Sequence, residues 1–372
     1  MIQRAHKIRL YPNKAQEQLL RKTVGVTRYA YNWGLDKWKE LYEKGEKVGA
    51  YTLSEIWTRE RPEWSKEVST CPPRHAFMNL QGAYKAFFKR TGKYPKRHKR
   101  GKHDSFYMTN DKAHVQGKKA FLQRVGWIRM AESLRYEDAK ILSYVVSCKA
   151  NQWFVSIQCE IDEDRRSEST SVVGVDVGIK HWAVASDGTV LDSPKRLKHF
   201  QRELKRKQRL ADRKQRGSKN QRKAHLKVSR LYQRIDNVKK DAIHKFTSTI
   251  SKNHGVVVLE DLCIEGMRKG VKSIRKGIND AAMGEIHRQL MYKCNNYIKV
   301  DRFFPSSKTC SHCGSIDDAL TLNDRTYQCR ACGAVIDRDL NASINLQNEG
   351  LRKLSTVGHT VKDHGVSPKD LK

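Results

Sequence analysis

The sequence lacks long hydrophobic stretches, and no apolar run approaches the ~20 residues that a membrane-spanning helix requires. Hydrophobic residues make up only 38% of its 372 residues, which is low but compatible with folding. The first seven residues, Met1 to Lys7, contain no apolar signal region. We therefore expect a cytoplasmic protein with no membrane partner, and the length favours two or three domains.

Acidic residues are scarce: 40 Asp and Glu stand against 74 Lys and Arg, a formal net charge of +34. So much charge of one sign repels itself in a folded chain, and a bound polyanion would offset the repulsion. The segment 195–245 is the most one-sided, with 20 Lys and Arg against four acids. Ordinary solvated helices alternate the signs of their charges, so we interpret this segment as a phosphate-contacting surface. The composition predicts a nucleic-acid partner.

Cysteine occurs nine times, and four of the nine have metal-ligand spacing, as Cys310-x-x-Cys313 and Cys329-x-x-Cys332. Two such turns supply the four thiolates of a tetrahedral zinc site. We therefore predict a zinc ribbon that holds a structural Zn²⁺, because four thiolates leave no open coordination position for catalysis. The other five cysteines are scattered and odd in number, which favours reduced thiols packed in a core.

The hydrophobic pattern divides the chain at the acidic, Ser-rich segment 162–170, which is the best linker candidate. Before it, residues 5–11 alternate like an edge strand, and two amphipathic helices follow. Short strands then occupy about 105–160, two of them forming a hairpin around Ala150. The N-terminal part therefore combines helices with an antiparallel sheet.

After the linker, the sequence begins with three strands in hairpin order, at 172–178, 181–186 and 189–192. A long helical region and a buried strand at 256–260 follow. We expect a mobile loop around Gly266, then a helix and a further strand, and disorder from about residue 351. The order β-β-β-α-β fits an RNase H-like fold.

Carboxylates stand where two of these strands end, at Asp176 and Glu260, and Asp337 and Asp339 follow the ribbon. A lone Asp after a strand is usually a turn residue, and the two late acids could cap a helix beginning near Ala342. Glu260 resists this explanation, because an unpaired charge after an apolar strand is costly. Together these acids predict a metal-dependent nuclease site, because carboxylates can hold two divalent ions around one phosphodiester.

Seven short motifs carry a resemblance to a known family. They are Lys7-Ile8-Arg9-Leu10-Tyr11-Pro12, Gly25-x-x-Arg28-x-x-Tyr31-Asn32, Gly174-Val175-Asp176-Val177-Gly178, Val258-Leu259-Glu260-Asp261-Leu262, Cys310-Ser311-His312-Cys313-Gly314, Cys329-x-x-Cys332-Gly333 and Asp337-Arg338-Asp339-Leu340-Asn341-Ala342. In these residues the chain resembles the TnpB proteins of bacterial insertion sequences, small relatives of type V CRISPR effectors. Ser343 stands where this family often has Ala, a departure that we consider harmless.

The resemblance implies an α+β multidomain architecture. A β-barrel wedge domain (about 1–12 and 105–165) would carry a helical recognition insertion (about 13–104). A RuvC-like nuclease domain with an RNase H-like fold would cover 171–350, with the zinc ribbon inserted at about 306–334 and a disordered tail at 351–372.

The resemblance also implies that Asp176, Glu260 and Asp339 are the catalytic, Mg²⁺-binding acids, with Asp339 chosen over Asp337 because it precedes x-Asn. The implied cofactors are structural Zn²⁺, two Mg²⁺ ions and a guide RNA copied from the transposon end. Expected partners are this RNA, the target DNA and a separate transposase encoded by the same element. The implied function is transposon-encoded, RNA-guided cleavage of matching DNA beside a short motif.

Two other functions remain open on the sequence alone. Some relatives have lost the acids and act as RNA-guided repressors, so a nuclease-inactive DNA-binding accessory protein is one alternative. A transposase that performs strand transfer is the other, and it would use the same three acids. Because all three are present here, we favour an active nuclease.

Overall fold

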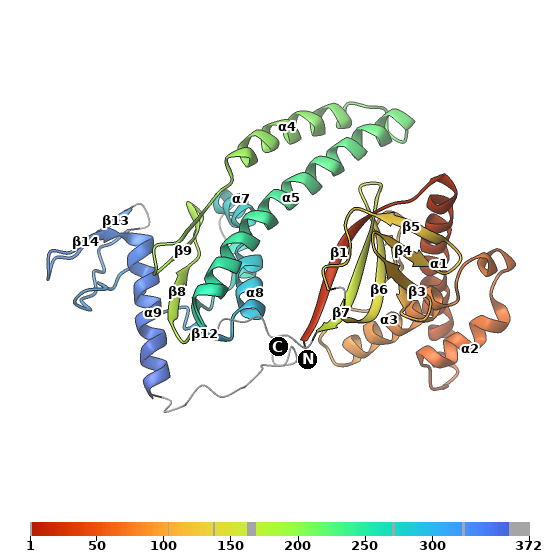
Figure 1. Ribbon diagram of the computed structural model, residues 1–372, viewed down its shortest axis with the longest axis horizontal. Coiled ribbons are helices and arrows are strands. Elements are labelled where there is room, and N and C mark those ends of the chain that lie inside the picture. The colour runs from red at the N-terminus through yellow and green to blue at the C-terminus, as the bar shows by residue number, and fades with distance from the viewer. Residues whose placement is uncertain are drawn as a thin grey trace. The chain divides into compact units, whose positions relative to one another are not determined.

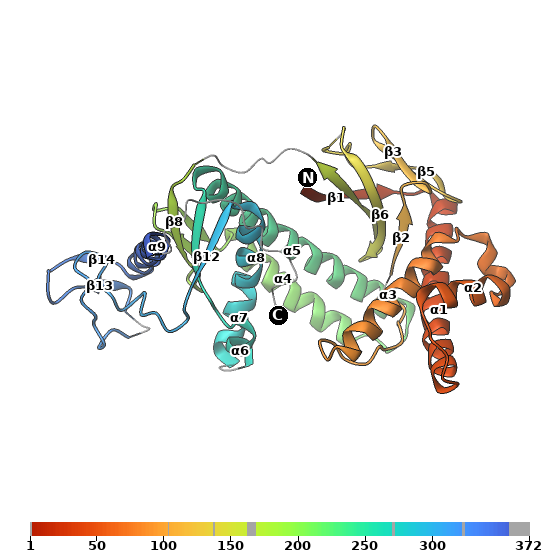
Figure 2. The same cartoon turned by 90° about the horizontal axis from the view of Figure 1, so that it is seen from below.

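The computed structural model describes residues 2–102, 104–136, 138–161, 169–269, 272–321 and 324–356. The chain divides into two compact units, Met1–Asp164 and Arg165–Lys372 (Figure 1 and Figure 2). Both units combine helices with a sheet, which confirms the α+β class. Across these described ranges, no helix has both the length and the apolar character needed to cross a membrane.

A seven-stranded antiparallel sheet, in the order β2-β6-β7-β1-β5-β4-β3, is the main sheet of the N-terminal unit. Its strands are β1 (Ile2–Tyr11), β2 (Ser105–Thr109), β3 (Ala113–Gln116), β4 (Lys119–Leu122), β5 (Gly126–Met130), β6 (Lys140–Lys149) and β7 (Gln152–Ile161). The prediction that the first strand is an edge strand is wrong. It pairs with β7 along its length and with β5 at Leu10 and Tyr11. Both partners come from distant parts of the chain, so the local pattern could not reveal them.

The hairpin of β6 and β7 confirms the turn predicted around Ala150. Ala150 and Asn151 have positive φ angles of 51° and 62°, as both central residues of a type I′ turn require. This turn matches the twist of its flanking strands, and it places Cys148 directly opposite Trp153. The turn therefore fixes the positions of Cys148 and Trp153 at the end of the hairpin.

Helices connect the first two strands of the N-terminal unit. They are α1 (Lys14–Glu43), α2 (Ala50–Glu60), the 3₁₀ helix η1 (Glu63–Glu67) and α3 (Cys71–Phe88). A capping box starts α1: the Asn13 side chain accepts a hydrogen bond from the Gln16 backbone N–H at 2.8 Å, and the Gln16 side chain returns the contact. The apolar faces of α1 and α3 pack together, with Trp38 stacked on Tyr84 at a centroid distance of 4.5 Å.

The C-terminal unit contains a five-stranded sheet in the order β10-β9-β8-β11-β12. Its strands are β8 (Val172–Asp176), β9 (His181–Ala185), β10 (Val190–Asp192), β11 (Val256–Glu260) and β12 (Asn296–Val300). The first three pair antiparallel, whereas β11 is parallel to both β8 and β12. Helices α4 (Lys195–Asp212) and α5 (Lys219–Asn253) lie between β10 and β11 in the chain. The predicted β-β-β-α-β order is therefore confirmed.

Helices cover both faces of this five-stranded sheet (Figure 1). Helix α5 and helix α8 (Met283–Lys293) pack over the odd-numbered side chains of β8 and β11. Helix α9 (Arg338–Thr356) packs over the even-numbered ones, with Leu346 among Val172, Val256 and Val258. Each strand therefore presents alternate residues to two different helical layers.

Glycine at position 174 allows α9 to lie directly against β8. A Cβ atom at this position would stand 2.0 Å from the carbonyl oxygen of Ser343 and 2.6 Å from the backbone nitrogen of Gln347. Gly350 permits a similar approach to β11, since a Cβ there would stand 2.3 Å from the Val258 side chain. The short distance between α9 and the sheet therefore depends on glycine, which has no side chain, at both positions.

The prediction of a mobile loop around Gly266 is wrong for the described residues. They form α6 (Ile264–Lys269) and α7 (Lys272–Ala281). Ile278 is fully buried in the core, and it fixes α7 by removing apolar surface from water. Gly266 and Gly277 therefore do not prevent regular structure here.

The tail predicted to be disordered from residue 351 begins with ordered helix instead. Helix α9 continues to Thr356, because Leu354 packs beside Leu346 and Lys353 donates a hydrogen bond to the Lys299 carbonyl oxygen at 3.0 Å. The rest of this tail, 357–372, lies outside the described residues, as does the linker segment 162–168.

The five scattered cysteines form no disulfide in the structure, and not all of them belong to a core. Cys159 and Cys294 are buried, and Cys71 and Cys148 are partly buried. Cys263 is exposed, so the core prediction is wrong for this residue. It lies just before α6, in the short segment where the chain leaves the sheet after β11.

We predict that Gly174→Ala destabilises the C-terminal unit, by about 1–3 kcal/mol, because the new methyl group would overlap the backbone of α9. Denaturant unfolding of the full chain measures the change. Gly82→Ala in α3 is the matched control, since its methyl group would meet nothing within 4 Å and helix propensity favours alanine. Equal stability of Gly174→Ala and the wild-type chain would show that α9 does not depend on this contact.

Candidate active site

Two of the predicted acids lie side by side at the carboxyl ends of parallel strands. Asp176 ends β8 and Glu260 ends β11, and the register pairs the residues just before them, Val175 with Leu259. Side chains alternate along a strand, so these even-numbered acids belong to the face covered by α9. Both are partly buried. The sheet therefore brings together residues that are far apart in the sequence.

The third acid comes from the first turn of α9. Asp339 is nearly buried, with 12% of its side chain exposed, and contacts the Arg338 guanidinium at 3.4 Å. Asp337 has a different role: its carboxylate accepts hydrogen bonds from the backbone N–H groups of Asp339 (2.9 Å) and Leu340 (3.1 Å). It is thus the N-cap of a helix that begins at Arg338, four residues earlier than predicted. Asp337 therefore caps the helix, and the Asp339 carboxylate remains available to the site.

The three acids interact through their charges. Burial, with the negative charges of Asp339 and Glu260, raises the pKa of Asp176 to about 7. Arg338 opposes this shift. Burial and the nearby carboxylate of Asp301 raise the pKa of Glu260 to about 7. This group of side chains disfavours further negative charge, as carboxylates do when they share a site without a cation.

Asp301 lies close enough to Glu260 to affect its pKa, and the sequence analysis did not consider it. It directly follows β12, and Val300 pairs with Glu260 in the parallel register. The apolar pattern predicts a strand over 297–304, which would place Asp301 inside the strand, whereas β12 (Asn296–Val300) ends just before it. An acid after each of three strands was the signal that could have found it.

The donor set suits hard divalent cations, which prefer carboxylate oxygens. Asp176, Glu260 and Asp339 would hold such an ion, and Arg338 would remain beside it to balance the charge. Their oxygens are not drawn together as closely as the ribbon thiols: among the described residues, only the cysteines form a group of three or more ligand atoms within 4.8 Å of one another.

The four ribbon cysteines fit a tetrahedral zinc ion. Their sulfur atoms all lie within 4.8 Å of one another, with Cys310 and Cys332 at 3.7 Å and Cys313 and Cys329 at 3.5 Å. A Zn–S bond of about 2.3 Å in a tetrahedron implies about 3.8 Å between sulfurs. The arrangement therefore supports the predicted structural Zn²⁺.

The two cysteine turns have matching backbone geometry. Each one ends in a glycine with a positive φ angle, Gly314 (77°) and Gly333 (74°), a conformation that glycine adopts without strain. The glycine N–H donates to the first cysteine carbonyl in both turns, at 2.9 and 3.0 Å. The second turn connects the two strands of a short hairpin, β13 (Thr326–Gln328) and β14 (Val335–Asp337), and β14 leads directly into α9.

Two buried asparagines join the ribbon to α9. The Asn341 side chain donates to the Thr309 carbonyl at 2.7 Å and accepts from the Ser311 N–H at 2.9 Å. Asn345 donates to the Ser306 and Thr309 carbonyls at 2.8 and 2.6 Å. These contacts connect the first cysteine turn to the helix that carries Asp339. The sequence analysis used Asn341 only as part of a motif and did not find this role.

Comparison with known proteins identifies the family. Family models match residues 1–47 ("Helix-turn-helix domain"), 156–270 ("Probable transposase") and 284–346 ("Cas12f1-like, TNB domain"). A Streptomyces pristinaespiralis protein named "Putative RNA-guided DNA endonuclease" is 34% identical over 94% of this chain and 90% of its own length. The chain belongs to the TnpB family. An Escherichia coli K12 relative, the "Putative RNA-guided DNA endonuclease InsQ", is 30% identical over 96% of this chain and 92% of its own length.

Solved structures share the fold at low sequence identity. A Cas12f1–sgRNA–target DNA complex gives a TM-score of 0.57 at 14% identity, over 94% of this TnpB chain and 99% of that chain. The mini-RNA-guided endonuclease CRISPR-Cas_phi3 gives 0.54 at 8% identity, over 98% and 94%. At these identities the likeness concerns the fold alone. The family model that matches residues 1–47 is described as a helix-turn-helix domain. In the structure, however, this region contains β1 and one continuous helix, α1.

We predict that the full chain carries about one Zn²⁺ and that Cys332→Ala loses it, because a tetrahedral site cannot close on three thiolates of this geometry. Elemental analysis of the purified protein measures the zinc. Cys263→Ala is the control, since this cysteine is exposed and lies outside the cluster. Full zinc content in Cys332→Ala would rule out the assignment.

A second prediction separates the two neighbouring aspartates. Asp337→Ala should lower the free energy of unfolding by about 1 kcal/mol through loss of the cap, whereas Asp337→Asn should retain it. Asp339→Asn should leave stability nearly unchanged and abolish divalent-ion binding, read by calorimetry with Mn²⁺. Retained Mn²⁺ binding in Asp339→Asn, together with its loss in Asp337→Asn, would reverse the two roles.

Proposed function

We propose that this chain is a transposon-encoded, RNA-guided DNA endonuclease that hydrolyses phosphodiesters with Mg²⁺. The observation that supports it best is the grouping of Asp176, Glu260 and Asp339 on one face of the sheet, with the negative charges of Glu260 and Asp339 helping to raise the pKa of Asp176. Such a group is costly for stability alone and is what a metal-dependent nuclease requires.

In this proposal the protein supplies position and charge. β8 and β11 hold Asp176 and Glu260 in register, and α9 brings Asp339 to them. Bound divalent ions would activate water and stabilise the leaving oxygen. Arg338 keeps the Asp339 carboxylate oriented from one side, and its own guanidinium is held by the Thr321 carbonyl at 3.3 Å. The zinc ribbon would then hold α9, the helix that carries Asp339, in position.

The charge distribution supports a long nucleic-acid partner. Of the 20 Lys and Arg in residues 195–245, 18 are exposed and none is buried. Figure 2 shows that α4 and α5, which carry most of them, form a long helical pair. An exposed cationic surface of this kind tracks phosphates without reading sequence. Relatives are named as RNA-guided enzymes, so we assign sequence reading to base pairing with a guide RNA from the transposon end.

We extend the proposal to the two units. The C-terminal unit would be the RNase H-like, RuvC-type nuclease domain, supported by its strand order and the acids at the strand ends. The N-terminal unit would be the wedge domain with its helical recognition insertion, supported by the antiparallel sheet interrupted by α1 to α3. A separate transposase of the same element remains an expected partner.

The name of one matching family model, "Probable transposase", favours a second candidate, strand transfer. A transposase would join DNA ends without needing a matching RNA. The two functions share the acids, so only the dependence on RNA separates them.

We predict that the chain, purified with RNA transcribed from the transposon end, cleaves DNA that matches the terminal segment of that RNA. Exchanging this segment should redirect cleavage to the new match, with mismatches near the adjacent motif most harmful because pairing begins there. Cleavage is measured on plasmid DNA in Mg²⁺. Asp176→Asn is the control, and it should bind the same RNA within a few-fold while cleavage falls to background. Equally efficient cleavage by RNA-free protein would overturn guidance and leave strand transfer ahead.

A further inference from the structure

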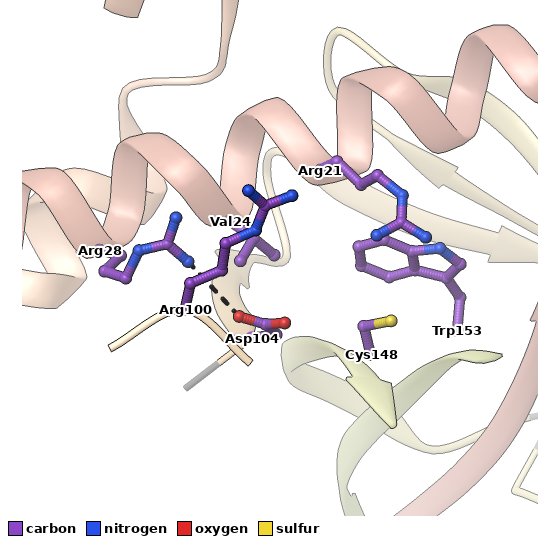
Figure 3. A pocket seen from close by; sticks show the side chains of 7 residues that line it. All are labelled: Arg21, Val24, Arg28, Arg100, Asp104, Cys148 and Trp153. Atoms are coloured by element: carbon purple, nitrogen blue, oxygen red, sulfur yellow. Dashed lines mark hydrogen bonds and ion pairs between the residues drawn. The ribbon is translucent and has the colours of Figure 1, made fainter. Parts of the chain in front are cut away.

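A cavity of about 110 Å³ lies within the N-terminal unit (Figure 3). It opens between α1, the β6–β7 hairpin and the segment that leads into β2. The residues that line it are Arg21, Val24, Arg28, Arg100, Asp104, Cys148 and Trp153. One water molecule needs roughly 10–15 Å³ on this measure, so the space suits a larger group.

Local structure explains how these residues meet. Arg21, Val24 and Arg28 are spaced i, i+3 and i+7, which puts them on one face of α1. Cys148 and Trp153 face each other across the hairpin. Arg21 joins the two elements, because it hydrogen-bonds to the Asn151 side chain in the type I′ turn. Its guanidinium also lies beside the Trp153 ring (Figure 3), 6.0 Å from the ring centroid. The cavity therefore has ordered walls.

Positive charge exceeds negative charge along these walls. Three arginines face the single carboxylate of Asp104, which Arg28 contacts at 3.4 Å. That carboxylate also accepts a hydrogen bond from the Gly101 N–H at 3.1 Å. Arg21 pairs outside the cavity with Glu17, and Arg100 makes no ion pair with a residue that the structure describes. The cavity can accept an anion without losing its internal pair.

Trp153 supplies a buried donor without an acceptor. Only 3% of its surface is exposed, and its indole Nε1–H has no hydrogen-bond partner within the described parts of the chain. A buried tryptophan N–H normally finds a partner, and leaving one unpaired costs free energy. An oxygen atom of a ligand in the cavity would complete the bond.

We propose that this cavity binds one phosphate group of the nucleic-acid backbone, with Trp153 donating its N–H and Arg100 and Arg28 supplying charge-assisted contacts. Guanidinium groups match phosphate oxygens in a bidentate way that lysine cannot. The proposal rests on the proposed function for the source of the phosphate, which is the guide RNA or the target DNA. The site would fix the position of one nucleic-acid strand along the surface of the N-terminal unit.

The first test observes the indole N–H directly. In ¹H–¹⁵N spectra of the full chain without added divalent ions, the Trp153 signal is assigned by its loss in Trp153→Phe, which keeps a packed ring. Titration with inorganic phosphate should shift this signal, and Arg100→Gln should weaken the apparent affinity about tenfold. Lys99→Gln is the matched control, since it removes the same charge one residue away from the cavity lining. No shift of the Trp153 signal at saturating phosphate would overturn the proposal.

The second test identifies the source of the phosphate. RNA from the transposon end and a DNA duplex are added separately, and the one that reproduces the Trp153 shift supplies the group. Arg100→Gln should weaken binding of that nucleic acid and reduce its salt dependence by about one phosphate contact relative to Lys99→Gln. Equal binding and equal salt dependence of the two variants would refute the site, while guided cleavage by the wild-type chain would still leave the proposed function standing. Conversely, a chain that binds no RNA fails the proposed function, although its Trp153 signal can still respond to phosphate.

Discussion

The packing of α9 against β8 is the contact on which the C-terminal unit depends. Gly174 lets the helix backbone touch the strand, and the first turn of that helix carries Asp339. Two turns of the same helix carry Asn341 and Asn345, whose side chains hold the first cysteine turn. Protein interiors are close-packed and transmit displacement. A shift of this one helix would therefore move the acid, one layer of the core and the zinc ribbon together.

Features encoded in short segments could be predicted from the sequence. The zinc ligands were found because each pair of cysteines lies within one turn, and the thiols of Cys310 and Cys332 indeed approach each other. The order of strands in the C-terminal unit was found because each strand has its own apolar pattern. Asp176 and Glu260 were candidates because each ends such a strand, and parallel pairing then places strand ends at one edge.

Features that require distant segments could not be predicted in the same way. Only the family resemblance favoured Asp339 over Asp337, because their roles depend on where α9 begins and propensity does not fix that residue to better than a few positions. Asp301 was hidden because the strand before it ends earlier than its apolar pattern suggests. The phosphate cavity was missed for a stronger reason: Arg28, Arg100 and Trp153 come from three elements, and no local pattern connects them.

The order of elements along the chain has a consequence for biosynthesis. The strand that ends in Asp176 is made early in the C-terminal unit, whereas the helix that completes its packing is the last described element. Contacts between such distant segments form late, because the intervening chain must first be closed into a loop. The nascent chain can therefore expose the cationic surface of residues 195–245 on the ribosome before its acids are assembled. Binding competence would precede any capacity to cut.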